Sequence, residues 1–160
     1  MKQQGFTLIE VLVYLALFAV LFGGTLASVH VLISGSNKNQ SVITLQQEGE
    51  FLMGKLNWAL AGASSLTVNS ATQITINKFD YGSNPVVFDL NSNKLRISQA
   101  SGAFVNLNSD NANITNLTFT DIPALGAKPQ GLKTLFTIQT LTSNGFSVSK
   151  VFETTKYLRK

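Results

Sequence analysis

The feature that most constrains this chain is an apolar segment near its N-terminus that carries a single acidic residue. Residues 6–33 are apolar or small except for Glu10, Tyr14 and His30. The segment is longer than the roughly 20 residues with which an α-helix crosses a bilayer. An ionised side chain at the centre of such a span costs about 3 kcal/mol, so an acidic residue there indicates a function. The sequence predicts a membrane-spanning helix in which Glu10 needs a cationic partner.

A secretory signal peptide is the first alternative for this segment. Such a peptide has a shorter apolar core followed by a small-residue cleavage site of the A-x-A kind, which residues 25–29 match poorly. An acidic residue at position 10 is also a poor choice for a segment that is only discarded. We therefore expect the apolar segment to be retained.

Two adjacent glycines, Gly23 and Gly24, interrupt the apolar segment. Each glycine inside a helix costs about 1 kcal/mol relative to alanine, so the pair is a weak point. Small residues also let neighbouring helices approach closely. The sequence leaves two interpretations open, a packing surface for another helix or a place where the helix loosens.

A second helical pattern follows a polar stretch at residues 34–39. Apolar or small residues recur at steps of three and four, which predicts one buried stripe on a helix from about Ser41 to near Gly62. The absence of a side chain at Gly62 suits a helix C-terminus. The pattern does not decide whether residues 34–39 break the helix. The stripe consists of Val42, Leu45, Gly49, Leu52, Leu56, Ala59 and Ala63.

Beyond residue 63 the pattern changes to short alternating segments separated by turns. These predict strands at residues 66–68, 73–77, 86–90, 94–98, 104–107, 114–122, 132–142 and 145–157. The first four form a meander, and the last two form a hairpin around Ser143-Asn144-Gly145. An antiparallel sheet with one apolar face covers the helix stripe. The fold class expected is α+β, a long N-terminal helix packed on an antiparallel β-sheet.

Composition and the scatter of reactive residues exclude several functions. The chain has no cysteine and one histidine, His30, so disulfides and thiolate metal sites are excluded. The net charge is +4, but the only basic cluster is at residues 156–160, so nucleic acid is not expected as a specific ligand. No nucleophile, base or phosphate-loop pattern predicts an enzyme. Residues 110–113 lack the ligand spacing of a calcium loop and are interpreted as a solvated turn. We expect no catalytic, cofactor-binding or metal-binding residues.

The motif Gly5-Phe6-Thr7-Leu8-Ile9-Glu10 resembles the processing site of type IV pilins and type II secretion pseudopilins. The resemblance is close over residues 1–30 and extends loosely to the whole layout, since that family packs a long N-terminal helix on an antiparallel sheet. It implies cleavage after Gly5 by a prepilin peptidase and methylation of Phe6. The segments 47–53, 61–65 and 151–155 resemble minor subunits of the J or W kind.

The resemblance also implies how the chain is organised and where it works. Residues 1–5 are a leader, 6–33 a transmembrane and filament-core helix, 34–63 an amphipathic helix, and 64–160 a β-rich head. The expected partners are the prepilin peptidase, other pilin or pseudopilin subunits and the inner-membrane assembly platform. The head lies outside the cytoplasm on a single-pass inner-membrane anchor, and the subunit then enters a pilus or pseudopilus.

Elementary electrostatics agrees with this layout. Cleavage after Gly5 places a positive amine on Phe6, and the amine of one subunit can neutralise Glu10 of its neighbour. Deleting one partner of a buried ion pair costs on the order of 3 to 5 kcal/mol, so the pair would select the axial register. The chain departs from many major pilins in lacking a proline within the apolar segment, where Gly23-Gly24 is a candidate substitute. It also lacks the C-terminal cysteine pair of many minor pilins.

The competing interpretation is a single-pass, membrane-tethered extracytoplasmic binding domain with an uncleaved anchor. In that case residues 1–5 stay attached and Glu10 is dispensable. The sequence does not distinguish secretion from adhesion, motility or DNA uptake, and it names no ligand of the head.

Overall fold

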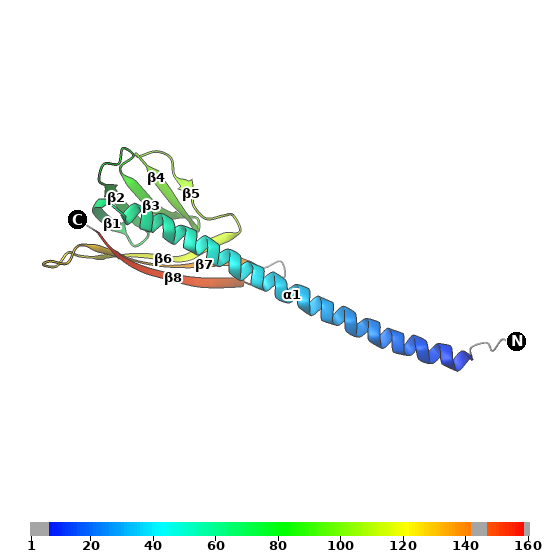
Figure 1. The fold of residues 1–160 in the computed structure, drawn as a ribbon. Helices are drawn as coiled ribbons and strands as arrows, with labels where there is room; N and C mark the ends of the chain where they lie inside the picture. Colours follow the sequence, from blue (N-terminus) through cyan, green and yellow to red (C-terminus); the bar gives the residue numbers. More distant parts are fainter. Residues whose placement is uncertain (1–6, 142–146, 159–160) are drawn as a thin grey trace. The chain divides into compact units, whose positions relative to one another are not determined.

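The computed structural model describes residues 7–141 and 147–158 of the chain and contains one long helix followed by strands (Figure 1). Helix α1 covers Leu8–Leu60. The strands are β1 (Ala63–Ser70), β2 (Gln73–Lys78), β3 (Val86–Asn91), β4 (Lys94–Gln99), β5 (Val105–Asn106), β6 (Ala112–Ile122), β7 (Gly131–Leu141) and β8 (Ser147–Tyr157). The chain divides into two compact units, Met1–Asn39 and Gln40–Lys160.

Helix α1 is uninterrupted, which answers the question that the sequence left open at residues 34–39. Residues 34–39 include Gly35 and have mostly low helix propensities, but none of them is a proline, and the helix on either side propagates through them cooperatively. The helix ends at Leu60, close to the predicted position. Gly62 follows with φ +73°, a left-handed conformation that glycine adopts without a Cβ clash, and its carbonyl accepts the Phe79 amide at 2.9 Å.

The predicted stripe is buried along most of its length. Leu45, Leu52, Leu56 and Ala59 are at most 1% exposed, and Gly49 is buried. The two ends of the predicted stripe differ from the expectation. Val42 is 38% exposed, and Ala63 belongs to β1 and not to the helix. The apolar face that packs on the sheets therefore begins about one turn later than the spacing alone indicated.

The strands form two antiparallel sheets where a single sheet was expected. The first has the order β1-β2-β3-β4-β5 and is the predicted meander, and the second has the order β6-β7-β8. β5 is only two residues long, shorter than the predicted residues 104–107. The predicted pairing of the last two strands is confirmed over their full length, from Gly131↔Tyr157 to Leu141↔Ser147. The predicted turn at residues 143–145 lies outside the described residues.

The second unit has one core, made by the C-terminal part of α1 and both sheets. Figure 1 shows that part of the helix running between the five-stranded and the three-stranded sheet. Leu52 and Leu56 of the helix, Ile74 and Phe88 of the first sheet, and Phe136 of the second are all fully buried. The α+β fold class is confirmed, with the helix stripe covered by two sheets.

The loop that joins the two sheets is held by two side chains. Asn108 is 4% exposed; its Oδ1 accepts the Leu95 amide at 2.8 Å, and its amide donates to the carbonyl of Ala112. The ammonium group of Lys94 donates to the carbonyls of Ser109 and Ala112 and lies 3.9 Å from the exposed carboxylate of Asp110. The ammonium group of Lys94 thus holds the turn at residues 109–112.

Candidate assembly site at the start of helix α1

The described chain begins at Thr7, and the first turn of α1 forms a capping box around Glu10. The Thr7 amide and hydroxyl both donate to Glu10 Oε2 at 2.9 Å, and the Glu10 amide donates to Thr7 Oγ1 at 3.4 Å. This reciprocal pattern satisfies amides that a helix N-terminus otherwise leaves without partners. Glu10 is exposed. Among the described residues its carboxylate bonds to a neutral partner, Thr7, which does not compensate its charge.

Within the described residues of its own unit, the helix that follows Glu10 has no apolar partner. Every large apolar side chain from Leu8 to Ile33 is at least 44% exposed, and the most apolar 18-residue window has a mean hydropathy of 2.2 with none of it buried. Burying one such side chain contributes about 1.5–3 kcal/mol, so this surface strongly favours an apolar environment. By length and composition α1 can cross a membrane. The capping box thus lies at the start of a surface that requires lipid or other helices.

The paired glycines lie within continuous helix, and their surroundings are open. A Cβ added at Gly23 or at Gly24 would meet no atom within 4 Å. Two hydroxyl groups next to them bond back to the preceding turn, Thr25 to the carbonyl of Leu21 and Ser28 to that of Gly24 at 2.9 Å. Such back-bonding satisfies the hydroxyl groups inside an apolar segment and bends helices slightly. Whether the glycines loosen the helix or receive a neighbour stays a prediction.

The remaining predicted site residues are separate from this geometry. Gly5 and Phe6, the predicted cleavage and methylation positions, lie outside the described residues. His30 is exposed on α1. In residues 7–141 and 147–158 no group of three or more His, Cys, Asp or Glu residues could hold a metal ion.

Sequence reasoning did not assign a role to Thr7, although the signal was present. The pattern Thr7-x-x-Glu10 directly before an apolar run is the sequence signature of a capping box. Thr25 and Ser28 were similarly passed over as small residues. Their hydroxyl groups matter because an unpaired polar group in hydrocarbon costs several kcal/mol.

Comparison with known proteins gives one match, at the N-terminus. Residues 1–26 match the family described as the prokaryotic N-terminal methylation motif. No curated protein and no solved structure matches the chain. The match covers the first 26 of the 160 residues, and the long apolar helix that begins inside it fits a membrane-anchored protein.

Proposed function

We propose that this chain is a subunit, a minor one of the J or W kind, of a type IV pilus or of a type II secretion pseudopilus. The observation that carries the proposal is the match of residues 1–26 to the prokaryotic N-terminal methylation motif. In this proposal the prepilin peptidase cuts after Gly5 and the new N-terminal residue, Phe6, is methylated.

The first turn of α1 supports a recruiting role for Glu10. In a single subunit the capping box with Thr7 keeps the carboxylate bonded and ordered at the start of the helix. Two neutral donors do not compensate its charge, and a charge in an apolar setting strongly favours an opposite charge. The methylated amine of Phe6 on a neighbouring subunit supplies that charge. Only one axial stagger of two helices brings the groups together, so the pair selects the register of assembly.

The exposed apolar surface of residues 8–33 supports the two locations of the subunit. In the membrane this surface faces lipid, and in the filament it packs against the helices of other subunits. The subunit begins as a single-pass protein of the inner membrane with residues 64–160 outside the cytoplasm. The assembly platform in that membrane then transfers it to the filament.

An intact mass of the protein purified from membranes tests the processing step. Loss of residues 1–5 with one added methyl group supports the proposal, and an intact leader contradicts it in favour of the uncleaved anchor. The assembly step needs a separate test with Glu10→Gln, which removes the charge but keeps the shape. We expect this variant to be processed normally but to be absent from sheared filaments. Undiminished incorporation would exclude the ion pair while leaving the subunit class in place.

A further inference from the structure

The loop between β6 and β7 is an exposed apolar projection, which we call the finger (residues 123–130). Leu125 at its tip is 78% exposed, although leucine is usually buried. The tip is held by reciprocal backbone bonds, Leu125 amide to Lys128 carbonyl at 3.2 Å and Lys128 amide to Leu125 carbonyl at 3.0 Å. At its base the side chain of Gln130 donates to Asp121 at 2.8 Å and to the carbonyl of Leu66 at 3.2 Å. A projection ordered in this way loses little entropy on binding.

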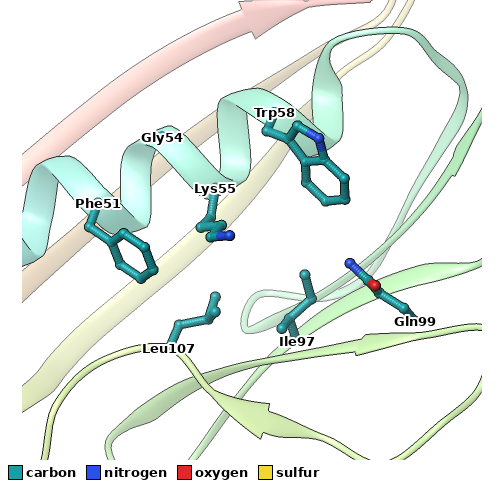
Figure 2. Close-up of a pocket in the computed structure, with 7 residues that line it drawn as sticks. All are labelled: Phe51, Gly54, Lys55, Trp58, Ile97, Gln99 and Leu107. Carbon is teal, nitrogen blue, oxygen red and sulfur yellow. The ribbon is translucent and has the colours of Figure 1, made fainter.

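A groove of the same unit runs along the exposed face of α1, between the helix and the segment from β4 to residue 109. We call it the helix groove. The part nearer the C-terminal end of α1, which we call the upper part, has a volume of about 440 Å³. It is lined by Phe51, Trp58, Ile97 and Leu107 among others (Figure 2). The lower part begins about two turns earlier on the helix, at Thr44, and has a volume of about 520 Å³. Phe51 and Leu107 line both parts. Phe51 is 46% exposed there, so the floor of the groove is an apolar surface open to a partner.

The finger and the lower part of the helix groove lie at different positions along α1. Strand β8 runs alongside α1, because Lys150 bonds to Gln46 at 3.0 Å whereas Tyr157 lines a pocket with Leu60. Tyr157 pairs with Gly131, the residue that follows the finger. The finger therefore extends beyond the C-terminal end of α1, as Figure 1 also shows, while the lower groove lies about 18 Å back along the helix, near Glu48.

We propose that the finger of one copy of this chain inserts into the lower helix groove of a second copy. Leu125 then covers Phe51 and Leu107, and Lys128 approaches the carboxylate of Glu48, which lines the same part of the groove. Glu48 has only a long contact, 3.5 Å from the Ser109 amide, among the bonds of the described chain. The opposite charges select the lower groove over the upper one, where Lys55 would repel Lys128.

The proposed contact joins two different surfaces of the subunit, the finger and the lower helix groove. Between parallel copies that are displaced along a filament, the contact is heterologous and repeats from one copy to the next, which produces an open chain of subunits. The inference rests on the proposed function and deepens it, because it names a contact between heads in addition to the helix contacts. For a minor component it requires that copies occupy adjacent positions in the filament.

The absence of cysteine from the chain allows a background-free crosslinking test. Full-length chains with Ala127→Cys and with Gln47→Cys, carrying different epitope tags, are produced in the same cells and treated with a short bis-maleimide. Both positions are exposed, one on the finger and one in the lower groove. We expect a mixed dimer in membranes and in sheared filaments. Ser149→Cys, an exposed position on β8, replaces Gln47→Cys as the matched control and should give none.

Two further variants test the chemistry of the contact. Adding Leu125→Ser to the finger chain should lower the mixed-dimer yield by about tenfold or more, since burying a leucine contributes at least one order of magnitude to an equilibrium. Adding Lys128→Glu should also lower the yield, and Glu48→Lys on the groove chain should restore it.

The same samples separate this inference from the proposed function. A processed chain that enters filaments without forming the mixed dimer, although both cysteines react with a monofunctional maleimide, overturns the finger contact alone. Equal yields with the Ser149→Cys control overturn it as well. An unprocessed chain contradicts the proposed function, and a mixed dimer in membranes would then still support the contact. Absence of both processing and mixed dimer overturns both.

Discussion

Gly49 of helix α1 lies directly against the side chain of Phe152 on β8, so replacing it with alanine should destabilise the head. A Cβ at this position would overlap the outer edge of the Phe152 ring. That ring cannot withdraw freely, because its face stacks on fully buried Phe136 with a centroid distance of 5.4 Å and an interplanar angle of 16°. Overpacking of this kind costs about 1–3 kcal/mol.

Gly54 provides a matched control on the same helix. A Cβ there would meet nothing within 4 Å. Replacing a helical glycine with alanine adds about 1 kcal/mol of stability from helix propensity alone, and Gly49→Ala receives the same gain. We therefore expect Gly54→Ala to raise the free energy of unfolding by about 1 kcal/mol. Gly49→Ala should lie below Gly54→Ala by the overpacking penalty of about 1–3 kcal/mol.

The assay is urea denaturation of the full chain in detergent, followed by fluorescence of the single tryptophan, Trp58. Trp58 reports on the head because it contacts Tyr81 edge-on at 5.7 Å between ring centroids. Phe152→Leu in the Gly49→Ala background should recover most of the difference, since it removes the ring that the new methyl group meets. The reasoning is refuted if Gly49→Ala and Gly54→Ala have equal stabilities within about 0.5 kcal/mol.

Three further substitutions test individual interactions. Thr7→Val keeps the shape of the capping residue but removes its hydroxyl, which should destabilise the first turn of α1 by about 1 kcal/mol. Hydrogen exchange of the amides in that turn should become several-fold faster, whereas Thr7→Ser should leave it unchanged. Lys94→Met leaves two loop carbonyls without their donor and should lower the free energy of unfolding by about 1–3 kcal/mol; full stability would show that the loop does not need the cation. Asp89→Asn breaks a charged pair in which Asp89 accepts two bonds from Arg96 across neighbouring strands and should lower the free energy of unfolding in the same urea assay. Adding Arg96→Gln should recover part of the loss.

Local pattern was enough to predict much of this fold. The stripe from Leu45 to Ala59 repeats with the period of a helix, and the strands alternate with the period of a pleated sheet, so both appear in any window of ten residues. The N-terminal motif around Glu10 and the left-handed Gly62 are also local signals. In each case neighbouring residues alone determine the conformation, which is why one sequence sufficed.

The tertiary structure decided what depends on residues far apart in the chain. The split into two sheets depends on where strands pair, and period-two alternation leaves the partner of a strand undetermined. The role of Gly49 is visible only when Phe152 is brought against it, and the groove beside Phe51 exists only because Leu107 lies opposite. At Glu10 the sequence showed a charge that needs a partner. The structure added the bonds by which Thr7 holds this carboxylate at the start of the helix, a local contact that the pattern Thr7-x-x-Glu10 already signals.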